Sequence, residues 1–153
     1  MKKFKVLLCA VLVAGFSFTS CSDDDEDTTP VNNGPVTNAA LEGKWMYSQE
    51  GVAGAGIESL QNHTHRTGCD KDYVRFSEGG RYSDVEFVED CAQEISGDTW
   101  VRNGNMITIG TGENATVEEI VVLNATELKV REVFQGTGNQ TAYYVTTYTR
   151  GSN

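Results

Sequence analysis

Two closely spaced histidines are the side chains of this 153-residue chain best suited to binding a metal ion. His63 and His65 would lie on one face of a strand, because side chains two residues apart point the same way. A carboxylate from Asp70 or Asp72 would complete a set of three ligands of the kind that zinc and similar ions prefer. Two exposed loop histidines are the simpler interpretation, and we expect no metal and no cofactor.

The sequence holds few groups for catalysis. It contains no Gly-x-Ser-x-Gly, no His-Glu-x-x-His and no phosphate-binding loop. Glu118 and Glu119 are adjacent, so on a strand they face opposite ways and cannot act as a carboxylate pair. Two histidines in one loop give little material for general-base chemistry. We therefore expect no catalytic residues and no enzymatic activity.

The charge of the chain argues against one class of partner. Its 22 acidic and 12 basic residues give a formal net charge of −10. Nucleic-acid binding needs clustered Lys and Arg, so we expect no nucleic-acid partner. The charge is also unevenly distributed, since three of residues 1–5 are lysines and residues 23–27 are all acidic.

Residues 1–20 have the pattern of an export signal. The basic start precedes an apolar run over residues 6–16, which is too short for a spanning helix of about 20 residues and matches a secretory signal. The following segment, Ser17 to Cys21, resembles the lipobox of bacterial lipoproteins. That resemblance implies cleavage before Cys21 and lipidation of its thiol, which would anchor the protein to a membrane. An ordinary signal peptide with an incidental cysteine is the alternative.

An acidic segment follows Cys21 directly. Such a block of like charges stays extended and hydrated, so we expect a tether over residues 21–39 and one domain over residues 40–153. The segment resembles the acidic export signal that one Gram-negative lineage places after a lipidated cysteine. This resemblance implies an outer-membrane lipoprotein displayed on the cell surface, and the alternative is a solvated spacer on a protein that faces the periplasm. The residues concerned are Ser22, Asp23, Asp24, Asp25, Glu26 and Asp27.

The domain after Ala40 has an all-β pattern. Short runs of β-branched and aromatic residues recur between Gly and Asn turns, without a sustained helical period. The predicted strands cover residues 41–50, 71–78, 81–90, 97–102, 105–110, 116–123, 127–135 and 141–150. Antiparallel hairpins leave two architectures, an up-and-down barrel and a two-sheet sandwich. We expect the eight-stranded barrel, because closure removes exposed edges.

Turn residues predict the register of three hairpins. Their turns are expected at 79–80, 103–104 and 124–127, and the last hairpin is expected to turn within 135–139. The corresponding pairs are Val74 with Val85, Trp100 with Ile107, and Val121 with Val130. These registers would turn the apolar side chains inward.

Cys69 and Cys91 are predicted to form a disulfide. The 79–80 hairpin places them one residue out of alignment at its open end, and a single β-bulge would bring them face to face. An exported chain lies where disulfides persist, and a loop of this size would stabilise the fold by roughly 3 kcal/mol. A metal or redox pair fits less well, because the two do not form Cys-x-x-Cys.

The ends of the predicted domain resemble those of lipocalins. Leu41 to Trp45 contains the Gly-x-Trp signature that opens the first lipocalin strand, and Arg150 lies where the lipocalin arginine packs across that tryptophan. The resemblance implies that Gly43, Trp45 and Arg150 close the barrel base. Later features follow the order of short lipocalin-like domains of bacterial lipoproteins, over nearly all of residues 41–150. They are Cys69, Tyr73 to Phe76, Gly79-Gly80, Tyr82, Cys91, Gly97 to Trp100, Asn105 to Ile109, Ile120 to Leu123 and Leu128.

The same resemblance implies that the barrel binds one small hydrophobic or amphipathic molecule. An eight-stranded barrel is just wide enough to hold such a ligand or to be filled by its own side chains. The candidate lining residues are Tyr47, Phe76, Phe87 and Trp100, and these positions would serve equally as core. Residues 51–68 lie where lipocalins carry a loop over the barrel mouth; we expect a flexible Gly-rich start and one helical turn over 57–61.

Two other functions stay open. A filled barrel would serve as a surface interaction or protease-inhibitor module with an unknown protein partner, and a third possibility is a structural lipoprotein. An open apolar cavity favours ligand binding, whereas a packed interior with an exposed apolar patch favours the interaction module.

Overall fold

The computed structural model describes residues 36, 38–135 and 141–152. Within them the chain forms nine strands, and no helix of the described residues is long and apolar enough to cross a membrane. The strands are β1 Gly43–Gly54, β2 Ile57–Asn62, β3 Tyr73–Ser77, β4 Arg81–Phe87, β5 Gln93–Asn103, β6 Met106–Ile109, β7 Thr116–Leu123, β8 Glu127–Gln135 and β9 Thr141–Arg150. The predicted signal peptide, Cys21, the acidic segment 22–27 and the turn of the last hairpin lie outside the described residues.

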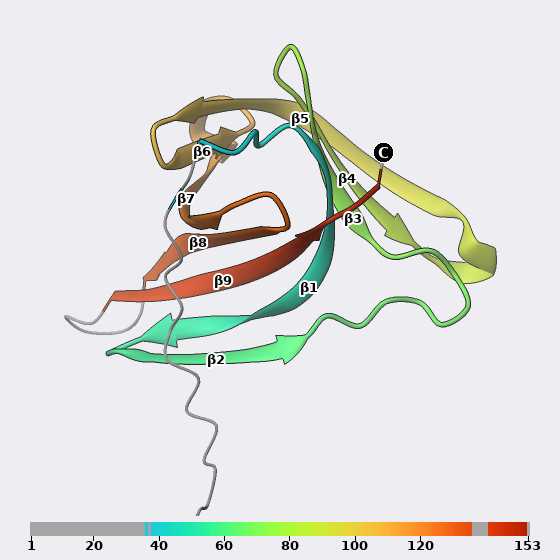
Figure 1. Ribbon diagram of the computed structural model, residues 1–153, viewed down its shortest axis with the longest axis horizontal. Helices are drawn as coiled ribbons and strands as arrows, with labels where there is room; N and C mark the ends of the chain where they lie inside the picture. Colours follow the sequence, from blue (N-terminus) through green and yellow to red (C-terminus); the bar gives the residue numbers. More distant parts are fainter. Residues whose placement is uncertain (1–35, 37, 136–140, 153) are drawn as a thin grey trace, which may run out of the picture. The chain divides into compact units, whose positions relative to one another are not determined.

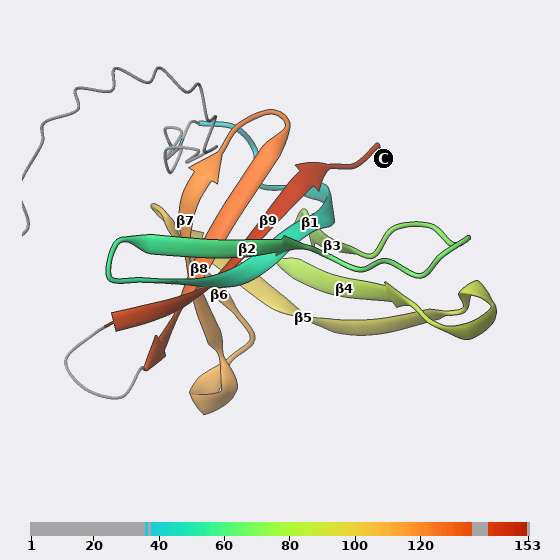
Figure 2. The ribbon, with the colours of Figure 1, turned by 90° about the horizontal axis from the view of Figure 1, so that it is seen from below.

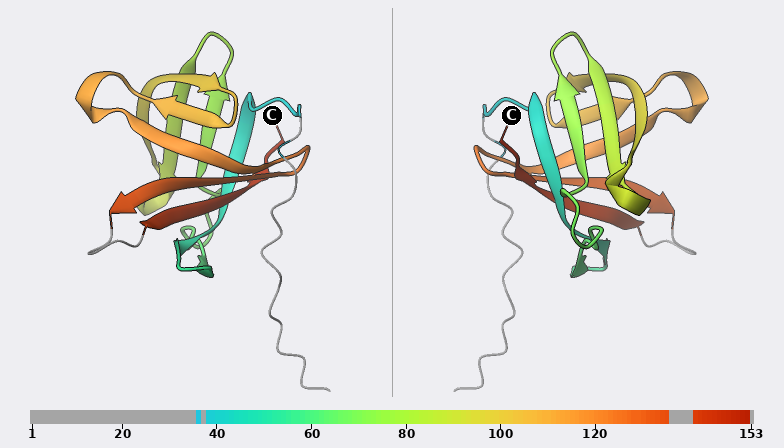
Figure 3. Two further views of the ribbon diagram at one scale, coloured as in Figure 1. Left: turned by 90° about the vertical axis from the view of Figure 1, so that its left-hand side faces the viewer. Right: turned by 90° about the vertical axis from the view of Figure 1, so that its right-hand side faces the viewer.

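Eight of these strands close into an antiparallel up-and-down barrel (Figure 1). Strands β3 to β9 each pair with the next, and β1 pairs with β3 along one edge and with β9 along the other. Figure 3 shows β8 and β9 running across the direction of β3 and β4, as expected for a strongly twisted sheet. The predicted barrel is therefore the observed architecture, and the two-sheet sandwich is not.

The prediction for residues 51–61 is wrong, because part of this segment forms β2, the one described strand that does not belong to the closed barrel. The expected flexible loop and helical turn are absent, because β1 continues to Gly54 and turns back at Ala55-Gly56 into β2. The outer half of β1 has partners on both edges, β9 and β2, and this pairing outweighs the low strand propensity of glycine. Gly51 is required at its position, because an added Cβ would overlap the carbonyl oxygen of Ser59.

The β1–β2 hairpin folds back over the outside of the barrel. In Figure 1 β2 lies beyond β9, and in Figure 2 it crosses in front of β8 and β9. A buried ion pair ties this crossing, since Lys129 Nζ of β8 donates to Glu58 Oε1 of β2 at 2.6 Å.

The hairpin of β3 and β4 is shifted by one residue from the predicted register. Val74 pairs with Asp84, not with Val85, because the turn contains three residues, 78–80, instead of two. A shift of one residue moves every side chain of a strand to the other face. Val85 and Phe87 therefore lie on the face of β4 opposite to Asp84 and to the core.

The registers of two further hairpins, β5–β6 and β7–β8, also differ from the prediction, with smaller effects on which side chains face inward. Trp100 pairs with Ile109, and this shift of two residues keeps the predicted inward face. In the β7–β8 hairpin Leu123 pairs with Leu128 as expected, but a bulge then sets Ile120 opposite Val130. Val121 is consequently displaced from the predicted inward position.

The base of the barrel is closed by a compact group of residues. Trp45 is fully buried, and its indole Nε1 donates to the Leu41 carbonyl at 2.7 Å. The guanidinium of Arg150 lies 3.8 Å from the Trp45 ring centre and donates to the backbone carbonyls of Ala40 and Glu42. Gly43 has φ +129°, and a Cβ there would collide with Arg150 Nη1. The contacts that Gly-x-Trp and the distant arginine implied are thus present.

Candidate functional site

Two of the four predicted ligand-lining residues belong to the packed core. Phe76 and Trp100 are buried, and their rings meet edge to face with centroids 5.3 Å apart. Trp100 also donates its indole N–H to the Ser77 carbonyl at 3.1 Å. The buried core cluster comprises Leu41, Trp45, Val74, Phe76, Trp100, Ile107, Ile120, Leu123, Leu128, Val130 and Tyr148. These aromatic positions are therefore part of the packed core.

The other two predicted lining residues lie outside this buried cluster. Tyr47 is partly buried, packs on the core and donates its hydroxyl to Asp84 Oδ2 at 3.0 Å. Phe87 faces away from the core and lines a surface hollow of about 570 Å³ beside His63 and Asp72. The four predicted residues therefore do not line one common cavity.

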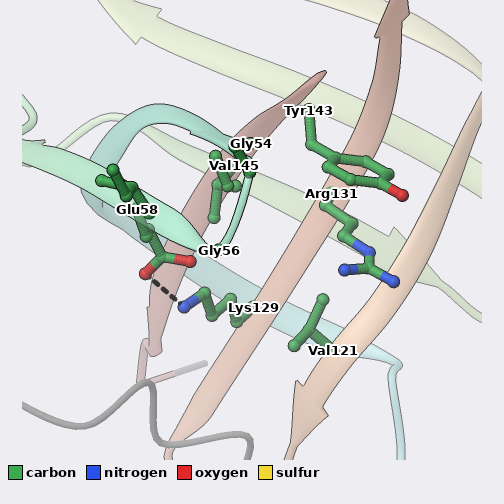
Figure 4. Close-up of a pocket in the computed structure, with 11 residues that line it drawn as sticks. Gly54, Gly56, Glu58, Val121, Lys129, Arg131, Tyr143 and Val145 are labelled. Atoms are coloured by element: carbon green, nitrogen blue, oxygen red, sulfur yellow. Dashed lines mark hydrogen bonds and ion pairs between the residues drawn. The ribbon is translucent and has the colours of Figure 1, made fainter. Parts of the chain in front are cut away.

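A cleft lies outside the barrel, between the tip of the β1–β2 hairpin and strands β7 to β9. Its volume is about 300 Å³, at the lower limit of ligand pockets. Lys129 and Arg131 flank Val130, which points into the core, so their side chains project from the outer face. The lining residues are Ala53, Gly54, Ala55, Gly56, Ile57, Glu58, Val121, Lys129, Arg131, Tyr143 and Val145 (Figure 4).

The cleft combines an apolar surface with two cations. Arg131 lies 4.4 Å from the ring centre of Tyr143 and pairs with Glu119 at 2.8 Å. Lys129 is engaged by Glu58, with both side chains largely buried. Figure 4 shows the Arg131 and Tyr143 side chains side by side at one wall and the Lys129–Glu58 pair at the other. Such a site suits a molecule with an apolar body and a polar or anionic head.

The interior of the barrel becomes polar beyond the core. Glu118 faces Glu132 across the β7–β8 ladder, and burial, followed by the charges of Glu132 and Asp84, raises the pKa of Glu118 to about 7. Burial also raises the pKa of Asp84, although the hydroxyl of Tyr47 opposes this shift. Burial likewise raises the pKa of Tyr47 itself. The Glu118 carboxyl group is therefore partly protonated near neutral pH.

Next to Tyr47, the structure brings together His63, His65 and Asp72. Asp72 Oδ2 lies 3.2 Å from both His63 Nε2 and His65 Nδ1. Burial alone would raise the pKa of Asp72, but the Phe87 N–H and the two imidazoles lower it overall. Of the two carboxylates considered from the sequence, Asp72 joins the histidines. The grouping of His63, His65 and Asp72 holds three possible metal-ligand atoms within 4.8 Å of one another.

The predicted disulfide is confirmed. Cys69 and Cys91 are bonded, with Cα atoms 5.3 Å apart. The bond does not use the expected β-bulge, because both residues lie beyond the β3–β4 ladder. It joins the loop before β3 to the short 3-10 turn Glu89–Cys91, where Asp90 and Cys91 have positive φ values. The bond thus fixes the loop that carries His65 and Asp72.

The residues of the cleft were missed by sequence reasoning. The signal for Lys129 and Arg131 was present, because their alternation with Val130 places them on the outer face of a strand. They line a cleft only because β2 covers that face of the sheet. The sequence did not indicate β2, because the glycines of residues 51–56 favour a loop.

Structural comparison finds similar folds at low sequence identity. A lipocalin-like protein from Bacteroides uniformis ATCC 8492 matches with a TM-score of 0.46 and 17% identity, over 68% of this chain and 96% of that one. Apocrustacyanins C1 and C2 match with TM-scores of 0.45 and 0.44 and 11% identity, over 73% of this chain and 61% of theirs. No protein-family model and no curated protein matches the chain.

Proposed function

We propose that the protein is a lipid-anchored barrel that binds a small amphipathic molecule in the cleft beneath the β1–β2 hairpin. The proposal rests on one observation: the open volume lies in the cleft beside a cationic side chain, and not in the core of the barrel. The core residues Phe76 and Trp100 contact each other, whereas the cleft offers about 300 Å³ beside Arg131 and Tyr143. The proposed ligand site therefore differs from the interior site that the sequence suggested.

The chemistry of the cleft favours an amphipathic ligand with an anionic head. Val121, Val145 and the Tyr143 ring would contact the apolar body, and the Arg131 guanidinium would face the head group. Both cations are paired with a glutamate, but the Lys129–Glu58 pair is largely buried, whereas the Arg131–Glu119 pair is about one-third exposed, so Arg131 is the more accessible cation. Binding and not catalysis is proposed, in keeping with the lack of recognised catalytic motifs in the sequence.

Anchoring and display are proposed on the pattern of residues 1–27. Lipidation of Cys21 would hold the protein at the outer membrane, and the acidic segment Ser22 to Asp27 would route it to the cell surface. Protease treatment of intact cells should then remove the domain. Protection of the domain until the outer membrane is breached would contradict surface display and favour the periplasm-facing alternative.

Native mass spectrometry of the protein purified from its own host tests the binding proposal. We expect a reproducible small-molecule adduct that is lost in Tyr143→Ala and kept in Tyr144→Ala. Tyr144 is a matched control because it is adjacent and does not line the cleft. A clean apo mass, together with failure to bind any anionic amphiphile, would contradict the proposal. Loss of the adduct in both variants would indicate a site elsewhere.

An interaction module is the second candidate function. Several large apolar side chains are exposed on the described surface, including Ile57, Ile95, Val101 and Val133. They favour a protein partner only if they form one continuous patch, since single exposed apolar residues are normal. Pull-down with an Ile95→Asp and Val101→Asp variant would distinguish this function from binding in the cleft.

A further inference from the structure

We propose that His63, His65 and Asp72 bind one divalent transition-metal ion of the zinc class. The three ligand atoms are His63 Nε2, His65 Nδ1 and Asp72 Oδ2, all within 4.8 Å of one another. This inference is independent of the cleft, because none of the three residues lines it.

The spacing of the ligand atoms fits a metal ion. Zinc bonds to histidine nitrogen and carboxylate oxygen are about 2.0–2.1 Å long, so neighbouring ligands of a tetrahedral site lie about 3.3 Å apart. Asp72 Oδ2 lies 3.2 Å from His63 Nε2 and 3.2 Å from His65 Nδ1. Two edges of a tetrahedron are thus already at the required length.

The hydrogen bonds of His65 leave two acceptors facing each other. Its Nε2 lies 3.0 Å from the Tyr47 carbonyl, so this nitrogen carries the proton and donates. Its Nδ1 accepts from the Asp72 backbone N–H at 3.1 Å and therefore presents a lone pair. Asp72 Oδ2 approaches the same nitrogen, and two lone pairs at this distance repel unless a cation lies between them. On binding, the metal would take the Nδ1 lone pair from the N–H group.

Outer hydrogen bonds hold each ligand in orientation. The Tyr47 carbonyl holds His65, Glu50 Oε2 lies 3.4 Å from His63 Nδ1, and the Phe87 N–H donates to Asp72 Oδ1 at 2.7 Å. Metal sites in proteins regularly show this second layer of partners on histidine and carboxylate ligands. The Tyr47 ring also stacks on the His63 ring with centroids 4.7 Å apart.

Burial, charge and access also suit a bound cation. The side chains of His63 and His65 are 19% and 18% exposed and that of Asp72 is 8% exposed, so the site is sheltered. With neutral imidazoles, Asp72 and Glu50 leave two negative charges that a divalent cation would balance. The hollow of about 570 Å³ lined by Thr67 leaves room for a water molecule or a small anion as fourth ligand.

The test is a zinc titration of the purified, untagged protein after treatment with a chelator, followed by calorimetry. We expect one Zn²⁺ per chain, with binding weakened about 100-fold or more in His63→Gln, His65→Gln and Asp72→Asn. Asp72→Asn keeps the Oδ1 that accepts the Phe87 N–H, so the fold should persist. Asp70→Asn is the matched control and should leave the affinity unchanged.

Cobalt provides a readout that needs no variant. Co²⁺ added to the wild-type protein should give the visible absorption of a tetrahedral site, and Zn²⁺ should abolish it. The proposal is overturned if the wild-type protein binds neither ion. It is also overturned if the three variants bind zinc as tightly as Asp70→Asn does, because the histidines and Asp72 would then form only a hydrogen-bonded network.

Discussion

Replacing Glu118 with glutamine should stabilise the protein at neutral and alkaline pH. Glu118 lies in the polar part of the barrel interior, opposite Glu132 and within the field of Asp84. Burial and these two carboxylates raise its pKa to about 7 from the ordinary value of 4.5. Glutamine has nearly the same shape and carries no charge, so it resembles the protonated glutamic acid.

The sign and size of the effect follow from the raised pKa. The folded protein holds the Glu118 proton more tightly than the unfolded chain, so this group favours folding below pH 4.5. That contribution is lost as the pH rises from 4.5 to about 7. One pKa unit corresponds to about 1.4 kcal/mol, and the shift therefore corresponds to about 3 kcal/mol. The wild-type protein should lose this amount through Glu118, and Glu118→Gln should not.

Urea unfolding, followed by tryptophan fluorescence at pH 4.5, 6, 7 and 8, measures the difference. The free energy of unfolding of the variant minus that of the wild type should increase by about 3 kcal/mol across this range. Glu119→Gln is the control, because Glu119 faces outward in a partly exposed ion pair with Arg131. Its loss should cost at most about 1 kcal/mol, with no gain as the pH rises. A difference between Glu118→Gln and the wild type that stays constant with pH would contradict a raised pKa of Glu118 in the folded protein.

Three further substitutions test the structure by their effect on the free energy of unfolding. Arg150→Lys should destabilise by about 1–2 kcal/mol, because lysine cannot keep both the indole contact and the two carbonyl hydrogen bonds. Replacing Cys69 and Cys91 together with serine should cost about 3 kcal/mol relative to the oxidised wild-type protein, and the reduced wild-type protein, as the control, should lose the same amount. Gly51→Ala should cost more than about 2 kcal/mol through overlap with the facing strand, whereas Gly54→Ala, which meets only ordinary contacts, should change stability by less than about 1 kcal/mol.

The sequence predicted the barrel well because its signals are local and repeated. Alternating β-branched and aromatic residues indicate strands wherever they occur, and the contact of Trp45 with Arg150 joins the two ends of the same sheet. The disulfide was predicted from the expected export and an approximate register, and the pairing is present because both cysteines lie in loops beyond the last ladder pair.

The faces of individual strands were harder to predict, because a register depends on one residue in a turn. Gly79 and Gly80 both have positive φ, but the turn also takes in residue 78, and this reverses the face of Phe87. Val121 was misplaced for a similar reason, since a bulge leaves no reliable mark in the sequence.

The candidate sites depend on contacts between segments that are distant in the sequence. The cleft requires β2. This strand forms because it pairs with β1, although the segment of β1 that precedes it is rich in glycine. The histidines were visible as a pair, but the choice of Asp72 over Asp70 depends on the path of the loop, which the disulfide fixes. The residue types of the histidine site were identifiable from the sequence, whereas the residues of the cleft required the tertiary structure.

Ligand binding in the cleft is best tested by a crystal structure of the protein purified from its own host together with its co-purified small molecule. We predict electron density for an amphipathic molecule between β2 and the outer face of β8 and β9, with its head group at Arg131 and its body against Tyr143. Density inside the barrel among Phe76 and Trp100, or an empty cleft in a protein that carries a bound small molecule, would contradict it.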